Sequence, residues 1–462
     1  MRRHVLERVK PRGRRISPES IELPSGYHIE AIVTDLNYPT SVSWDPDGNL
    51  LIAESTFAYG RAAPTDIRIV RQEPDGVLTT VIGGLDQPIN DITVDQGLLY
   101  VAQRGRIILA EGERPRPLIT RLPSWGRHQN GALAFGPDGR MYFGQGTVSN
   151  AGVVGPQELE QLQSAGEPLG HDVPGDEVAL TGECYDVADP ATGEVRPTGA
   201  FSPWGVAPPA GTRIPGARPG QAASGAIMSA NRDGSDLRVW AWGFCDPFGL
   251  VWDGARLFVV DRGPEPLPPR AIVGAPDVLW MARQGAWHGW PDFVAGRPVT
   301  DPAYQQPCMP IGFLLANHGE LLGGRTAPGQ PVLSFGPRVS AAKFDLCRHR
   351  TFGFAGQAFV AEFGPLLRPQ EVQPRLPGGH RVVRADLHSR TVADFAVNRS
   401  RMPASLTGDG GGLERPIQAR FGPDGHLYIV DFGVVEFRED VGDWVATEAT
   451  GVIWRVSRRA GW

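Results

Sequence analysis

The sequence lacks long hydrophobic runs. No apolar stretch reaches the roughly 18 residues that a membrane-spanning helix requires. The first residues, "MRRHVLERVKPRGRR", contain paired arginines but no apolar segment of the kind that a secretion signal needs. We therefore expect no membrane span and no signal peptide. On this basis the protein is cytoplasmic as the sequence stands, and periplasmic or secreted if the sequence has been trimmed.

Cysteine is scarce, and neither sign of charge dominates. The four cysteines, at positions 184, 245, 308 and 347, have no metal-type spacing and could form at most two disulfides, whose pairing stays open. Asp and Glu (51) slightly outnumber Lys and Arg (45), and no sustained basic face is present. Nucleic acid is therefore not an expected partner. The basic cluster at the N-terminus predicts a flexible arm over residues 1–24.

Helix signals are also rare, whereas residues that favour turns are abundant. Gly (59) and Pro (43) make up about a fifth of the 462 residues, which suits short strands joined by turns. Only "GPQELEQLQSAG" (155–166) resembles a helix. The composition therefore indicates an all-β protein.

A hairpin pattern recurs along the chain. In "RHQNGALAFGPDGRMYFGQGT" (127–147), Pro-Asp-Gly separates two apolar runs and predicts a tight turn. Similar hairpins are predicted within 41–55, 91–105, 249–263, 340–364 and 418–433. A further strand is predicted after each hairpin, within 66–76, 105–113, 225–234, 277–285, 380–389 and 451–459.

Such repeats cannot bury both of their faces alone, and radial stacking of four-stranded units gives a β-propeller. We predict six four-stranded blades in a single domain, residues 25–462. Segments 26–33 and 451–457 should pair and close the ring. The long insertions, 148–224 and 286–330, are expected on the top face, opposite the Pro-Asp-Gly turns.

Polar residues gather at the predicted top face, because the chain enters each first strand and leaves each second strand there. They are Glu54, Arg104, His128, Asp246, Arg262, Arg338, Glu362, Arg415 and Asp431. One histidine among several arginines and carboxylates is typical of a ligand site. The competing interpretation is that these side chains only satisfy the backbone groups of the loops. A small-molecule ligand is the expected partner.

Several stretches resemble the glucose/sorbosone dehydrogenase family. They are 127–147, 198–205, 239–253, 285–302, 357–364 and 415–433, which occur in the family's order. The resemblance implies a six-bladed propeller that uses pyrroloquinoline quinone (PQQ) and calcium. It also implies oxidation of a sugar or related alcohol, with electrons passed on to an acceptor.

The resemblance assigns roles to residues of the top face. His128 matches the general base that takes the hydroxyl proton while hydride passes to the quinone. Gly263 and Pro264 match the backbone ligands of calcium. Arg415 matches an arginine that neutralises the cofactor carboxylates, and Arg262 and Arg338 could add positive charge.

Two departures from the family pattern fall at the same face. Cys245-Asp246 stands where the family has Arg-Asn against the quinone, so one positive charge is lost and a negative one is gained. Cys245→Arg is therefore expected to raise quinone affinity or activity. Thr147 stands where the family has the aspartate that orients the histidine, which leaves His128 without an obvious carboxylate partner.

Two other functions stay open. The protein also resembles six-bladed calcium-dependent lactonases, in which case Glu54, Asn90, Asn130 and Asp431 would hold the metal. The departures at Cys245 and Asp246 alternatively suit a propeller that has lost its chemistry and acts as a binding module.

Overall fold

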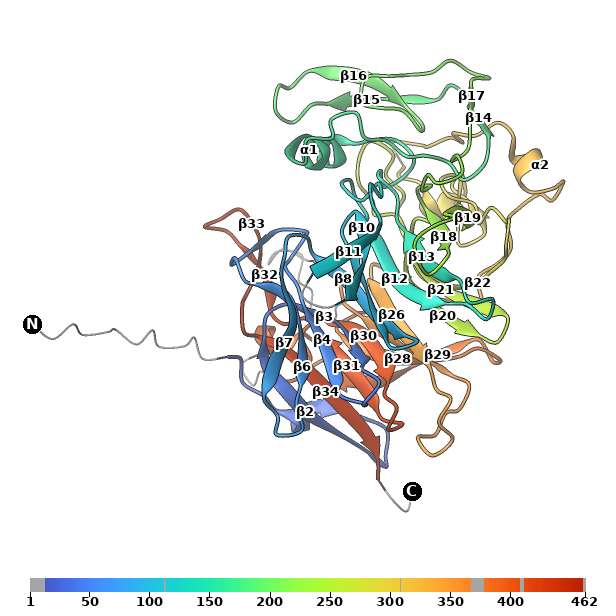
Figure 1. Ribbon diagram of the computed structural model, residues 1–462. Helices are drawn as coiled ribbons and strands as arrows, with labels where there is room; N and C mark the ends of the chain where they lie inside the picture. The colour runs from blue at the N-terminus through green and yellow to red at the C-terminus, as the bar shows by residue number, and fades with distance from the viewer. Residues whose placement is uncertain (1–12, 112–113, 308, 367–377, 408–410, 460–462) are drawn as a thin grey trace, which may run out of the picture.

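The computed structural model describes residues 13–111, 114–307, 309–366, 378–407 and 411–459. As predicted, the regular secondary structure of these residues is almost entirely β-strand, and their sheets are arranged like the blades of a propeller (Figure 1). The helices are α1 (Pro156–Ser164), α2 (His318–Leu321) and short 3-10 turns at Pro18–Ser20, Pro302–Tyr304 and Ala404–Leu406. None of the helices in the described ranges is long and apolar enough to cross a membrane.

Four sheets contain four antiparallel strands each, and neighbouring strands follow chain order. The first comprises β3 (Pro39–Trp44), β4 (Leu50–Glu54), β6 (Ile67–Gln72) and β7 (Leu78–Leu85). The second comprises β8 (Ile89–Asp95), β9 (Leu98–Gln103), β10 (Arg106–Glu111) and β11 (Arg114–Ile119). The third comprises β12 (Asn130–Phe135), β13 (Met141–Gln145), β18 (Ala226–Ala230) and β19 (Arg238–Trp242). The fourth comprises β20 (Asp246–Asp253), β21 (Arg256–Arg262), β22 (Pro276–Ala282) and β25 (Leu333–Pro337).

The remaining large sheet has nine strands in the order β1-β29-β28-β27-β26-β30-β31-β34-β2. Their bounds are β1 (Ile21–Glu22), β2 (Tyr27–Leu36), β26 (Ala341–Leu346), β27 (Ala358–Glu362), β28 (Arg381–Asp386), β29 (Thr391–Asn398), β30 (Pro416–Phe421), β31 (Leu427–Asp431) and β34 (Gly451–Arg458). A single parallel residue pair, Lys343 with Gln418, joins β26 to β30. Strand β2 pairs with β34, with Ile29 opposite Val456. The predicted pairing of the two terminal segments is therefore confirmed.

The long insertions carry small sheets of their own. These are β14 (Val178–Ala179) with β17 (Arg213–Ile214), β15 (Cys184–Ala188) with β16 (Val195–Gly199), and β23 (Phe293–Val294) with β24 (Arg297–Pro298). In Figure 1, α1 and β14–β17 lie together beyond one end of the third sheet. A three-stranded sheet joins β5 (Arg61–Ala62) to the hairpin of β32 (Val435–Arg438) and β33 (Asp443–Ala446).

Local turn chemistry explains the hairpins, and all six predicted hairpins form antiparallel pairs. In the turn between β12 and β13, Asp138 Oδ1 accepts the Arg140 N–H at 3.1 Å, and Asp138 Oδ2 accepts the Tyr142 hydroxyl at 2.7 Å. Asp424 accepts the Tyr428 hydroxyl at 2.9 Å in the same way. Each aspartate therefore caps its own turn and ties it to the following strand.

A buried polar network joins three of the first strands of the sheets. Lys343 Nζ donates to the carbonyl oxygens of Thr40 at 2.7 Å and Asn90 at 2.5 Å. Asp91 Oδ1 lies 3.4 Å from the same Nζ and accepts the Ser41 hydroxyl at 2.6 Å. These bonds connect β3, β8 and β26, and Thr40 and Asn90 also line the cavity described below.

Part of the N-terminal segment packs on the propeller. Arg14 Nη2 lies 2.5 Å from Asp431 Oδ2, and β1 pairs with β29. The predicted division of the chain at residue 24 stays a prediction, and residues 1–12 lie outside the described ranges.

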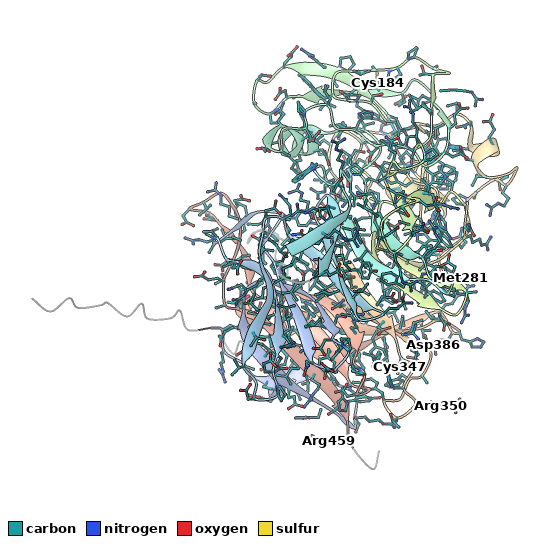
Figure 2. All side chains as sticks on the ribbon, viewed as in Figure 1. Cys184, Met281, Cys347, Arg350, Asp386 and Arg459 are labelled. Atoms are coloured by element: carbon teal, nitrogen blue, oxygen red, sulfur yellow. The ribbon has the colours of Figure 1, made fainter. Side chains whose placement is uncertain are left out.

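The described cysteines are free thiols. Cys184 is exposed on the insertion, whereas Cys347 is buried in the body of the propeller, well apart from it (Figure 2). Cys245 is also free and buried, and Cys308 lies outside the described residues.

Candidate functional site

A cavity of about 620 Å³ opens at the end of the inner strands where His128 lies. This volume falls within the usual range for small-molecule sites. Its ionisable lining includes Arg127, His128, Glu160, Arg262, Asp277 and Arg338. Its aromatic lining includes Phe57, Tyr59, Phe248, Phe363, Phe437 and Trp444. The cavity therefore combines flat apolar surfaces with charged groups.

His128 lies in the loop immediately before β12, at the opposite end of that strand from the Pro-Asp-Gly turn. Its backbone N–H donates to Thr147 O at 3.0 Å, which fixes the loop. The side chain is 10% exposed, and Nδ1 lies 3.1 Å from Asp246 Oδ2. The expectation that His128 lacks a carboxylate partner is therefore wrong. The partner is the first residue of β20 in the neighbouring sheet, a contact that sequence order does not reveal.

Asp246 is buried and bound to Arg262. The two residues face each other at the ends of β20 and β21, and Arg262 Nε donates to Asp246 Oδ2 at 2.6 Å. Burial alone would raise the pKa of Asp246, but the charges of Arg262 and His128 outweigh it and lower the pKa to about 2. The Arg262 guanidinium also lies over the ring of Phe248, 4.2 Å from its centroid. The negative charge that Asp246 adds is thus neutralised within the cavity wall.

Cys245 contacts His128 but is not among the residues that line the large cavity. Its side chain is buried, with Sγ 3.7 Å from His128 Nε2 and 3.6 Å from Asn150 O. Burial, together with the nearby charges of Asp261 and Asp246, holds the pKa of the Cys245 thiol well above its usual value. The expectation that this residue faces the cofactor is corrected accordingly: the thiol contacts the histidine instead.

Arg415 is also turned away from the cavity. Its guanidinium donates to the carbonyl oxygens of Gly364 at 3.2 Å, Pro365 at 3.0 Å and Val435 at 3.3 Å. Burial lowers its pKa to about 10. Arg415 therefore holds two loops of the cavity wall together, and a direct contact with a ligand would require these bonds to break.

Two other arginines lie on the wall itself. Arg338 is exposed, lines the cavity and makes no hydrogen bond or ion pair with the described residues. Arg127 is paired with Glu265 and donates to Gln157 Oε1 at 3.2 Å. Arg338 is thus the better placed of the two to receive an anionic ligand.

Gly263 and Pro264 follow β21 and line the cavity. The Gly263 N–H donates to Asp277 Oδ1 at 3.0 Å. Among the described residues, neither the Gly263 nor the Pro264 carbonyl oxygen accepts a hydrogen bond. Unpaired carbonyl oxygens are hard ligands of the kind that calcium prefers. Their role in binding calcium stays a prediction.

The four residues considered for a lactonase-type metal site serve other contacts. Glu54 accepts the Asn37 N–H at 2.7 Å, and Asp431 accepts the Arg415 N–H at 2.7 Å. Asn130 Oδ1 accepts the Gly105 N–H, and Asn90 Nδ2 donates to Asn130 O. Across the described ranges, no three or more His, Cys, Asp or Glu side chains form a group that could hold a metal ion. The contacts of these four residues therefore agree with the interpretation that such side chains satisfy the backbone groups of the loops.

Sequence patterns missed part of the wall. Gln157, Glu160 and Gln161 reach the cavity from α1, while Phe437 and Trp444 reach it from the β32–β33 hairpin. Both elements are insertions outside the repeat, and no motif marks their side chains as cavity residues. Helix α1 itself was predicted, but its position was not.

Three solved structures are similar to this chain over nearly their whole lengths. The holo form of a pyranose dehydrogenase PQQ domain from Coprinopsis cinerea is 14% identical, with a TM-score of 0.57 and coverage of 97% of this chain and 98% of that one. A calcium structure of a Trichoderma reesei carbohydrate-active enzyme is 14% identical, with a TM-score of 0.55 and coverage of 97% and 99%. The PQQ-bound aldose sugar dehydrogenase from Streptomyces coelicolor is 16% identical, with a TM-score of 0.50 and coverage of 94% and 99%.

The chain has the fold of these three proteins, two of which are sugar dehydrogenases by name. The resemblance predicted from the sequence is therefore confirmed at the level of the fold. No protein-family model matches the sequence, and no curated protein matches it significantly. At these identities the likeness concerns the fold alone, and the chemistry has to be argued from the site.

Proposed function

We propose that this protein is an oxidoreductase that oxidises a sugar in the 620 Å³ cavity, using PQQ and calcium. One observation carries the proposal: on a propeller of this fold, a histidine held by a buried carboxylate lies on the cavity wall. A histidine whose other nitrogen is fixed by an acid is a common form of general base.

The residues of the wall fit a planar cofactor with three carboxylates. Phe248 and Arg262 line the cavity, where Arg262 is paired with Asp246, and Arg338 offers an unpaired positive charge on the same cavity. The free carbonyl oxygens of Gly263 and Pro264 would hold calcium beside it. Arg415 would act from behind the wall by shaping the 363–365 loop.

In this proposal His128 accepts the proton of the sugar hydroxyl at a ring nitrogen. Asp246 stabilises the positive charge that His128 then carries, and Arg262 keeps Asp246 ionised. Helix α1 and the β32–β33 hairpin form part of the cavity wall. When bound, the quinone supplies the acceptor for the two electrons that leave the sugar carbon, and an external acceptor must reoxidise it.

We also propose that the propeller has six blades. Support comes from the inner strands, because β3, β8, β12, β20, β26 and β30 each lie beside the next, and β30 lies beside β3. The nine-stranded sheet divides at its single parallel pair into β26–β29 and β30, β31, β34 and β2, each with four main strands.

Equilibrium titration with PQQ, with and without calcium, tests the proposal. We expect micromolar binding that requires calcium and weakens in Arg338→Gln, because that variant removes an unpaired positive charge from the wall. Dye reduction over a series of aldoses would then identify the substrate. Absence of binding at micromolar PQQ would overturn the proposal, and lactone hydrolysis without quinone would indicate a hydrolase instead.

A further inference from the structure

Two of the residues that depart from the family pattern, Cys245 and Asp246, have side chains that contact His128. Asp246 Oδ2 lies 3.1 Å from Nδ1, and Cys245 Sγ lies 3.7 Å from Nε2. Their backbone N–H groups both donate to Asp261 Oδ1, at 3.1 Å for Cys245 and 2.8 Å for Asp246. The buried carboxyl group of Asp261 therefore fixes the turn that presents both side chains to the two nitrogens of one ring.

The chemistry of these groups determines where the ring proton lies. Arg262 holds the pKa of Asp246 at about 2 against the effect of burial, so this carboxylate only accepts hydrogen bonds near neutral pH. An ionised carboxylate 3.1 Å from Nδ1 favours a hydrogen on that nitrogen. Nε2 is left with a lone pair, and the neutral Cys245 thiol lies 3.7 Å from it and 3.6 Å from Asn150 O, so the single thiol hydrogen is available to either acceptor.

We infer that Asp246 and Cys245 are positioning residues that hold His128 in its Nδ1–H tautomer, with the Nε2 lone pair kept ready for a substrate hydroxyl. A thiol is a weak hydrogen-bond donor. A hydroxyl can therefore displace it from Nε2, whereas a stronger donor at residue 245 would compete with the substrate.

Other ionisable groups surround this arrangement, and none of them replaces Asp246 at Nδ1. Arg262 faces Asp246 from β21, and Tyr59 faces the Arg262–Asp246 pair across the cavity. Glu158 of α1 and Arg127 face His128, while Asp172 and Asp261 face Cys245. The Asp246 carboxylate is the one that contacts the ring.

These roles depend on the proposed function, since only a base needs a defined lone pair, but the tautomer can be measured without any cofactor. Nitrogen-15 NMR of histidine-labelled protein, recorded where the neutral ring predominates, distinguishes Nδ1–H from Nε2–H. The signal of His128 is assigned by its loss in His128→Gln. We expect the Nδ1–H form in the unmodified protein, and the Nε2–H form there would overturn the inference.

Asp246→Asn should shift the ring toward the Nε2–H form, because an amide can donate to Nδ1. If the protein is active, turnover should fall by about 10²–10⁴-fold, as expected when a base has the wrong tautomer. Glu362→Gln is the matched control, because Glu362 is an equally buried carboxylate bound to Arg381 at 2.7 Å. It should cost stability but leave the His128 signal unchanged. An unchanged tautomer in folded Asp246→Asn would contradict the role of Asp246.

Cys245→Ser tests the thiol separately. A hydroxyl donates more strongly to Nε2, so we expect KM to rise by about 2–10-fold with little change in kcat and no change of tautomer. An unchanged KM would contradict the role of Cys245. If the Nδ1–H form is found but no aldose is oxidised, the proposed function fails and the positioning of His128 stands.

Discussion

The Cys245 side chain occupies a site with no room for a longer residue. It is 3% exposed, and the void beside it has a volume of only about 20 Å³. We therefore no longer expect Cys245→Arg to restore the charge pattern of the family and raise quinone affinity. An arginine here would have to displace Asn150 or His128, so its charge would not reach the cavity without a shift of the wall.

We predict that Cys245→Arg lowers the free energy of unfolding by about 1–3 kcal/mol or more, because overpacking a core usually has an effect of this size. Thermal unfolding would measure the loss. Cys184→Arg, at the exposed cysteine, is the control and should unfold at nearly the unmodified temperature. A Cys245→Arg protein of normal stability with tighter quinone binding would contradict the buried position of this thiol.

Asp246 should also affect how the stability of the protein depends on pH in acid. The pKa of Asp246 is about 2 in the folded protein, below the usual 3.8. Ionised Asp246 therefore contributes fully to the free energy of unfolding above pH 3.8, and this contribution is lost as the pH falls through 2. We predict that the unfolding free energy of the unmodified protein drops by about 2 kcal/mol more across this window than that of Asp246→Asn. Urea unfolding at several pH values would measure it. Parallel pH dependence of the two proteins would contradict the ion pair.

Sequence reasoning located the site residues but not their partners. His128, Arg262, Gly263 and Pro264 were placed at one face because local turn chemistry fixes where each strand begins and ends. The contact between His128 and Asp246 was missed because it joins two sheets across 117 intervening residues, a distance over which no local pattern acts. The same reason explains why the inward orientation of Arg415 could not be foreseen.

At the scale of elements, one buried arginine ties the two long insertions together. Arg270 is 1% exposed and donates to Ala151 O at 3.0 Å, Gly312 O at 2.7 Å and Asp292 Oδ1 at 3.0 Å. These contacts connect the segment before α1 with the 286–330 insertion. Because α1 supplies part of the cavity wall, Arg270 should also stabilise the cavity.

Arg270→Met should destabilise the protein by about 3–5 kcal/mol, since it removes the buried arginine paired with Asp292 and leaves this carboxylate only His318 and the backbone N–H groups of Leu314 and Leu315. Hydrogen exchange should quicken in both insertions. Arg297→Met is the matched control, because the Arg297–Asp301 pair is solvent-exposed at the arginine and should contribute about 1 kcal/mol or less. If hydrogen exchange quickens equally in the two variants, the claim that Arg270 holds the two insertions together is contradicted.

The inner elements were predictable, and the outer ones were not. Each hairpin carries its own turn signal, so β12 and β13 could be placed from the sequence. Strand β25 begins at Leu333, far along the chain from the end of its neighbour β22 at Ala282. Its pairing depends on how the intervening insertion folds, which no hydrophobic pattern specifies.

For the molecule as a whole, ring closure was predicted because the terminal segments each lacked a partner elsewhere. The pairing of β2 with β34 gives the ring a continuous sheet at the point where the chain begins and ends. A closed ring fixes the relative positions of the inner strands. It thereby brings His128 and Asp246, from different sheets, within 3.1 Å on one cavity wall.

Turnover of His128→Gln, after reconstitution with PQQ and calcium, tests the central claim most directly. Cofactor affinity is followed in the same samples by titration, so that loss of chemistry is separated from loss of binding. We predict that aldose oxidation falls by about 10²–10⁴-fold while the Kd for PQQ changes little, as expected for removal of a general base. Undiminished turnover in His128→Gln would contradict the account.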